Sequence, residues 1–172
     1  MQLGFCKIFN RLIGYNVDKV NERGETRLYR AVRDGNLDEA RRLLAKGANP
    51  NAPNKHGRTP MHAAAYLGET TIYEELMTKG GDPSVKDWRG RNALHSAAVC
   101  GGYRLRAKII DMTAKKYPGL MDEKDQYGWS PRDFMTLWED NANAAQKLKE
   151  FMELDEVSAY QKGYKPKPPS VH

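Results

Sequence analysis

The sequence predicts an all-α solenoid, in which helix-turn-helix units stack side by side and are joined by hairpin-like loops. Residues of the same kind recur at intervals of 33 positions, which is the signature of a repeat architecture. Each unit carries two short helical segments and cannot bury its apolar face alone, so neighbouring units must form one shared core. The recurring columns are Gly24, Gly57 and Gly90; Gly35, Gly68 and Gly101; and the apolar pairs that begin at Leu43, Leu76 and Ile109.

Length and composition leave room for one such domain with short flanking segments. The chain has 172 residues, of which 40% are hydrophobic, a modest fraction that suits an elongated stack with much surface. It contains no run of about 18 apolar residues, so no membrane-spanning helix is predicted. Two cysteines, Cys6 and Cys100, cannot form a disulfide framework, and we therefore expect a cytoplasmic protein.

The first helix of each unit is marked by residues suited to its start and its end. Proline stands at Pro60 and Pro131, where a missing N–H costs nothing. Alanines such as Ala64 and Ala97 let neighbouring helices approach closely, and glycine is predicted to turn the chain into the second helix. Short oxygen-bearing side chains able to cap these helices form one column, namely Thr26, Thr59, Asn92 and Ser130.

The third unit is longer than the first two, because its glycine column reaches Gly128 after 38 residues instead of 33. Thr113 occupies the position at which the preceding unit has a helix-ending glycine. We therefore predict a second helix over residues 104–116 that continues for about one extra turn and stops at Tyr117-Pro118-Gly119. The extension is interpreted either as tolerated length variation, which is favoured, or as a functional bulge.

Two stretches of the second unit resemble the ankyrin repeat: GRTPMHAAAYLG, which begins at Gly57, and KGGDP, which begins at Lys79. The resemblance extends from Val20 to Met152. It weakens at both ends, where residues such as Tyr29 and Asp133 replace those of the family, and these departures are interpreted as polar caps. The implied organisation is an N-terminal segment 1–19, four repeats at 20–52, 53–85, 86–123 and 124–152, and a tail at 153–172.

The candidates for catalysis are few. His62 and His95 occupy the histidine column of the ankyrin resemblance, which implies that each imidazole bonds to the backbone of the adjoining loop. Cys100 follows His95 by five residues, and side chains at that spacing on a helix diverge by roughly 140°, so a Cys-His dyad is not favoured. The chain has no C-x-x-C pair, Walker loop or G-x-G-x-x-G motif. We expect no enzyme, and neither a metal ion nor a cofactor.

The net charge of +6 is unevenly distributed. The basic excess lies mainly in repeat three, whereas repeats two and four are slightly acidic. Nucleic-acid binding requires a continuous basic track, which this pattern lacks. The excess is therefore interpreted as a solvated helix surface or a patch for an acidic partner, and nucleic acid is not the favoured ligand.

The ankyrin resemblance implies that partners bind to the concave face, which is formed by the loop tips and the exposed side of the first helices. All three tryptophans fall at such positions, and Trp, Tyr and Arg dominate binding hot spots. We therefore expect a monomer that binds a protein partner as an adaptor, inhibitor or scaffold. Two alternatives are that Trp138 closes the last repeat and that Trp88 and Trp129 stack on each other. The predicted contact residues are Arg58, Tyr66, Leu67, Trp88, Arg89, Arg91, Val99, Tyr127, Trp129 and Trp138.

The flanking segments allow a second interpretation. Phe5, Phe9 and Leu12 share one helical face, which favours a helix that caps the first repeat over one that binds a membrane surface. The end of the chain, rich in Pro and Lys, is expected to stay outside the core. The alternative function is a bacterial or viral effector, secreted into the cytosol of a host cell, which engages host proteins through the same face and uses a terminal segment for targeting.

Overall fold

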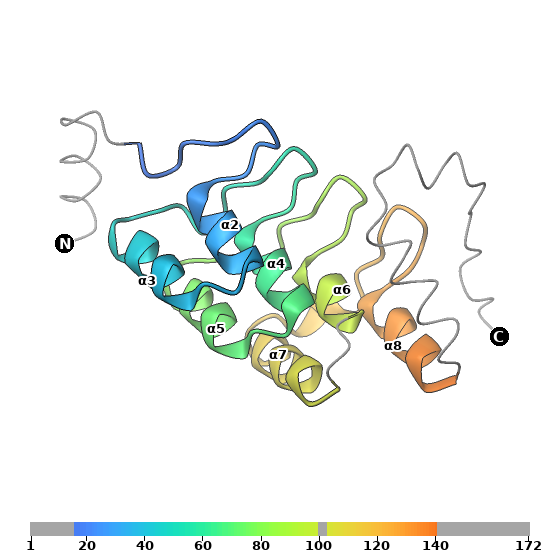
Figure 1. Ribbon diagram of the computed structural model, residues 1–172. Helices are drawn as coiled ribbons and strands as arrows, with labels where there is room; N and C mark the ends of the chain where they lie inside the picture. Colours follow the sequence, from blue (N-terminus) through green and yellow to red (C-terminus); the bar gives the residue numbers. More distant parts are fainter. Residues whose placement is uncertain (1–15, 100–102, 141–172) are drawn as a thin grey trace.

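The protein is an elongated stack of helix pairs joined by long loops (Figure 1). The computed structural model describes residues 16–99 and 103–140. In this part of the chain, α2 (Arg27–Arg33) pairs with α3 (Leu37–Ala45), α4 (Pro60–Leu67) with α5 (Thr70–Thr78), and α6 (Ala93–Ala98) with α7 (Tyr103–Lys116). A short 3-10 helix, η1 (Pro118–Met121), precedes α8 (Pro131–Asp140). The predicted all-α solenoid is confirmed.

The helices form two layers. The first helices α2, α4, α6 and α8 contact one another in sequence, and α5 contacts α3 and α7 in the second layer (Figure 1). Apolar side chains between these helices are withdrawn from water, and a fully buried leucine contributes roughly 2 kcal/mol through the hydrophobic effect. The fully buried members of this core include Leu28, Leu43, Met61, Leu76, Leu94 and Ile109.

The predicted capping column starts each first helix. Thr26 Oγ1 accepts the N–H of Tyr29 at 3.1 Å, and Asn92 Oδ1 accepts the N–H of Leu94 at the same distance. Thr59 forms a reciprocal capping box with His62. Each such bond satisfies an N–H group that has no partner inside its helix. The local sequence therefore fixes where these helices begin.

The loops stack on one another through a repeated backbone hydrogen bond. The N–H of Lys55 donates to the carbonyl of Arg23 at 3.2 Å, and the N–H of Trp88 donates to that of His56 at 3.1 Å. Gly57 permits this approach, since its φ of +74° is left-handed and a Cβ there would lie 3.0 Å from the Trp88 nitrogen. The glycine column found in the sequence thus marks the contact between loops.

The predicted extension of the third unit is confirmed. Helix α7 has 14 residues, whereas α3 and α5 have nine each, and it ends at Lys116. Thr113 lies inside it, fully buried, and its hydroxyl donates to the carbonyl of Ile109 at 2.7 Å. Because its only proton is used there, the hydroxyl of Tyr73 donates to Thr113 Oγ1 at 2.9 Å. The extra length therefore joins α7 to the second unit.

The last residues of the predicted N-terminal segment belong to the stack. Val17 is 8% exposed and packs with the core, and Asp18 accepts the N–H of Asn49 at 2.9 Å. Residues 1–15 of the predicted capping segment 1–19, Cys100 and the tail 153–172 lie outside the described residues. Among the residues that are described, none belongs to a helix with the length and apolar character needed to span a bilayer.

Candidate binding surface

The two histidines of the repeat column hold the next loop in place. His62 Nδ1 accepts the N–H of Thr59 at 3.2 Å, so its Nε2–H donates to the carbonyl of Arg91 at 2.9 Å. His95 repeats this arrangement, with Nε2 at 3.0 Å from the carbonyl of Trp129. The predicted bonding of both imidazoles to loop backbone is confirmed.

Burial keeps these imidazoles neutral. Desolvation lowers the pKa of His95 to about 4 and outweighs its hydrogen bond to the Trp129 carbonyl, which would raise the pKa. The pKa of His62 is lowered for the same reason. Both rings are uncharged at pH 7, and their nitrogens are occupied by backbone or capping partners.

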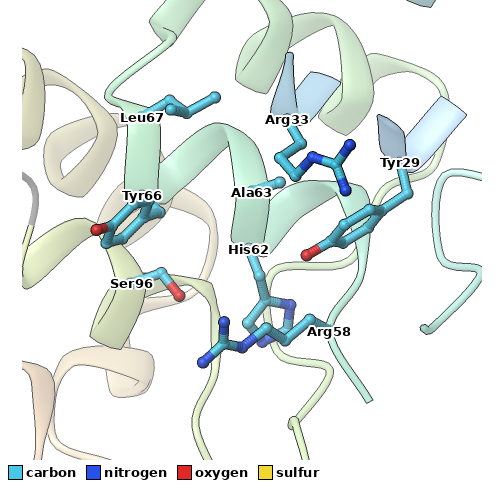
Figure 2. Close-up of a pocket in the computed structure, with 8 residues that line it drawn as sticks. All are labelled: Tyr29, Arg33, Arg58, His62, Ala63, Tyr66, Leu67 and Ser96. Atoms are coloured by element: carbon cyan, nitrogen blue, oxygen red, sulfur yellow. The ribbon is translucent and has the colours of Figure 1, made fainter. Parts of the chain in front are cut away.

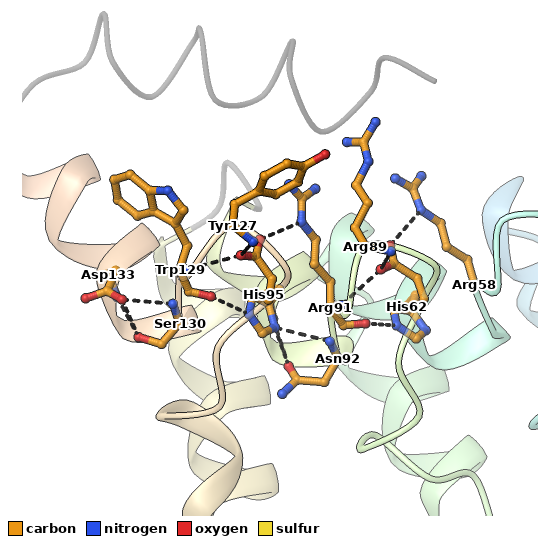
Figure 3. A network of polar contacts seen from close by, with 12 residues as sticks. Arg58, His62, Arg89, Arg91, Asn92, His95, Tyr127, Trp129, Ser130 and Asp133 are labelled. Atoms are coloured by element: carbon orange, nitrogen blue, oxygen red, sulfur yellow. Dashed lines mark hydrogen bonds and ion pairs between the residues drawn. The ribbon is translucent and has the colours of Figure 1, made fainter. Parts of the chain in front are cut away.

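Below the loop tips, acidic and basic side chains form a ladder of ion pairs whose carboxylates are buried (Figure 3). Arg91 Nε lies 3.1 Å from Asp125 Oδ2, and neither side chain has exposed surface. In the same way, Arg58 Nε lies 3.6 Å from Asp87 Oδ2, and this pair joins the two preceding loops. Desolvation lowers the pKa of Arg91 to about 10, which leaves it charged at pH 7. These ion pairs join each loop to the next one.

The column of residues that shapes these loops is not among the residues predicted from the sequence. In each loop one side-chain oxygen accepts the backbone N–H groups two and four residues later; Asp87 Oδ1, for example, accepts those of Arg89 at 2.9 Å and Arg91 at 3.0 Å. The signal was available, since Asn or Asp recurs three residues before each loop glycine. The column consists of Asn21, Asn54, Asp87 and Asp125.

Four of the predicted contact residues are covered. Arg89 and Arg91 are 0% exposed, Val99 is 1% exposed and Trp129 is 6% exposed, so the expectation that they present open side chains is wrong. The side chain of Arg91 is directed to Asp125, with which it forms the buried ion pair. The guanidinium of Arg89 lies over the Trp88 ring at 4.6 Å.

Val99 and Trp129 are covered because they form a small apolar cluster on the first-helix layer. Trp129 stacks on Phe134 at 5.7 Å with an interplanar angle of 29°, and Ala98 and Val99 complete the cluster. Trp88 has a different ring partner, His56, at 6.2 Å. Trp88 and Trp129 thus each have a ring partner other than the one expected in the alternative Trp88–Trp129 stack.

The remaining predicted residues are accessible to different degrees. Leu67 is 38% exposed, and the side chain of Arg58 is 30% exposed. Tyr66, Trp88 and Tyr127 are half-buried. The side chain of Trp138 lies outside the described part of the chain.

A hollow of about 240 Å³ opens on the first-helix layer (Figure 2). It lies where α2 and α4 contact each other, and α6 closes it with one serine. Two of the predicted residues, Tyr66 and Leu67, lie on α4 at its edge, and Arg58 reaches it from the loop before α4. The residues that line it are Tyr29, Arg33, Arg58, His62, Ala63, Tyr66, Leu67 and Ser96.

Charge pairs organise the α2 side of this hollow. Arg33 Nη1 lies 2.6 Å from Glu25 Oε1, and Arg33 Nε lies 2.9 Å from Asp34 Oδ1. Burial alone would raise the pKa of Glu25, but hydrogen bonds from Asn21 and Arg33 hold it below its usual value. Tyr29, interpreted from the sequence as a polar cap, is 6% exposed and lines the hollow instead.

The described residues contain no group of three His, Cys, Asp or Glu side chains that could hold a metal ion. The surface around the hollow presents aromatic rings and arginines, which are residue types enriched at protein–protein interfaces, together with one exposed leucine and hydroxyl-bearing side chains.

A family model described as ankyrin repeats (3 copies) matches residues 1–87. No curated protein matches the chain significantly. The helix pair α6–α7 and helix α8 follow the matched segment and continue the same stack.

Proposed function

Because the chain belongs to the ankyrin repeat family, we propose that it binds its partner through the layer of first helices and the loop tips, as an adaptor, inhibitor or scaffold. Ankyrin repeats are generally protein–protein interaction modules and are typically not enzymatic. Our proposal goes beyond these family properties in three respects: the binding face, the role as adaptor, inhibitor or scaffold, and a cytoplasmic site of action.

The observation that carries the proposal is the exposed leucine beside the hollow. Leu67 lines the hollow and is 38% exposed. Its neighbour Tyr66, in contrast, packs against the apolar cluster. A large apolar side chain at the edge of a concave, partly aromatic surface gains free energy when a partner covers it. The only other exposed large hydrophobic residue of the described chain, Val20, does not line the hollow.

Site-directed photo-crosslinking tests the position of the face. A photoreactive phenylalanine derivative is placed at Leu67 or, as the matched control, at Lys79, which is exposed at the end of α5. We expect an extract of the native host to give a crosslinked protein from position 67 and not from position 79.

Capture with variants supplies the second measurement. Leu67→Arg is expected to abolish retention of the crosslinked protein, because a charge cannot be buried against an apolar partner without cost. Val20→Arg, at 53% exposure, is expected to retain it. The same crosslinked protein from both positions, or retention by Leu67→Arg, would place the binding face elsewhere.

A further inference from the structure

We propose that the hollow between α2 and α4 receives an acidic side chain of the partner, a carboxylate flanked in its own chain by an apolar residue. This inference rests on the proposed function, and it specifies the chemistry of the segment that binds there.

The charges at the hollow support a carboxylate. The lining residues include two cations, Arg33 and Arg58, and no anion. Their side chains are 39% and 30% exposed, so both can be reached from solvent. Tyr29 and Ser96 line the same space and carry hydroxyl groups (Figure 2). Guanidinium and hydroxyl groups that line one hollow are complementary to an anionic acceptor.

The α4 side of the hollow requires an apolar neighbour. Ala63 and Leu67 belong to this side, and Leu67 is 38% exposed. A carboxylate alone would leave the leucine in water, whereas an adjoining apolar residue would cover it. The partner segment is therefore expected to be amphipathic over two neighbouring positions.

Carboxylates behind the arginines favour a ligand with a single charge. Glu25 and Asp34 lie at 2.6 and 2.9 Å from Arg33, and Asp87 lies 3.6 Å from Arg58. A partner carboxylate can share guanidinium donors with them. A phosphorylated side chain carries about two negative charges at pH 7 and would be repelled more strongly by the same three groups. The hollow is thus suited to Asp or Glu rather than to a phosphate.

Selection from a phage-displayed library of random peptides, with the full chain as bait, tests this chemistry. We expect the recovered peptides to share one Asp or Glu next to an apolar residue. Synthetic copies of one such peptide then carry the acid, its amide isostere, or phosphoserine at that position. The acidic copy is expected to bind about tenfold more tightly than the amide copy, because hydrogen bonds to a charged group are lost. It is also expected to bind more tightly than the phosphoserine copy.

Variants of the chain locate the acid. Arg58→Gln and Arg33→Gln are each expected to weaken the acidic peptide and to leave the amide copy nearly unchanged. Arg42→Gln is the charge-matched control, since Arg42 is 53% exposed and pairs with Glu39 at a distance from the hollow. We expect it to change neither affinity. Circular dichroism shows whether each variant folds, and Arg33→Gln provides the test if Arg58→Gln does not.

The outcomes separate this inference from the proposed function. Peptides that Leu67→Ser weakens but that show no preference for an acid would overturn the inference and leave the binding face in place. Peptides that are indifferent to Leu67→Ser and to both arginine variants would overturn both. Tighter binding of the phosphoserine copy, or a library that enriches no peptide, would also overturn the inference.

Discussion

Single residues in this protein act mainly by pinning one repeat to the next. His62 and His95 each cap a helix with one ring nitrogen and hold the following loop with the other. Arg91 and Asp125, which are 34 positions apart, form a fully buried ion pair. Removing one member of such a pair is costly, because the other is left charged and unpaired. The polar groups below the loops therefore specify how the loops are stacked.

The buried imidazole of His95 predicts a loss of stability in mild acid. Its pKa is about 4 in the fold and near 6.5 when unfolded, so the unfolded chain binds more protons between these values. The contribution of the neutral His95 ring to the free energy of unfolding is complete above pH 6.5 and falls as the pH decreases toward 4. By pH 5 the free energy of unfolding should have fallen by about 2 kcal/mol from this group.

Urea denaturation at pH 7 and pH 5 measures this effect. His95→Gln is the matched variant, because its amide can donate to the Trp129 carbonyl but does not titrate. We expect the wild type to lose about 2 kcal/mol more than this variant between the two pH values. An equal loss in both proteins would show that His95 does not control the acid response.

At the scale of elements, the turns within units and the loops between units depend on glycine for different reasons. Gly35 and Gly57 both have left-handed φ angles, of +69° and +74°. A Cβ at Gly35 would meet no atom within 4 Å, whereas at Gly57 it would lie 3.0 Å from the Trp88 nitrogen and 3.1 Å from the Cα of Asp87. The first glycine serves only the turn, and the second also serves the contact between loops.

This difference predicts unequal costs for the same substitution. Gly35→Ala is expected to lower the free energy of unfolding by about 1 kcal/mol through backbone strain. Gly57→Ala adds a clash with the backbone of the next loop and should cost at least about 1 kcal/mol more. Chemical denaturation of the two variants measures the difference. Equal costs would mean that the loops can separate without penalty.

At the scale of the whole molecule, stability follows from contacts between neighbouring units. Helix α4 contacts α2 on one side and α6 on the other, and six consecutive residues from Pro60 to Ala65 are buried. Helix α2 contacts α4 but has no described first helix on its other side. In a stack of this kind, each unit is stabilised by the interfaces it shares.

Hydrogen exchange should therefore be slower in the second unit than in the first. We expect the backbone amides of α4 to exchange more slowly than those of α2, because opening α4 disrupts two interfaces. Exchange followed by mass spectrometry on peptides from each helix measures the order. Uniform rates would indicate one cooperative unit, and faster exchange in α4 would contradict the expected dependence on neighbours.

The sequence by itself determined the repeat period, the capping residues and the longer α7, while the role of the two histidines was implied by the resemblance to the ankyrin repeat. These features depend on residues within one unit or on a fixed column of the repeat, so they can be recognised without coordinates. Even the missed Asn and Asp column is visible as a repeat in the sequence.

Only the tertiary structure decided which side chains remain open. Trp129 and Leu67 both occupy predicted binding positions, yet Trp129 is covered and Leu67 is exposed. The difference depends on Phe134, which stacks on Trp129, and on the hollow that leaves Leu67 uncovered. Exposure is set by the side chains of adjacent units and by the shape of the space between them, and neither is determined by a residue's place in the repeat.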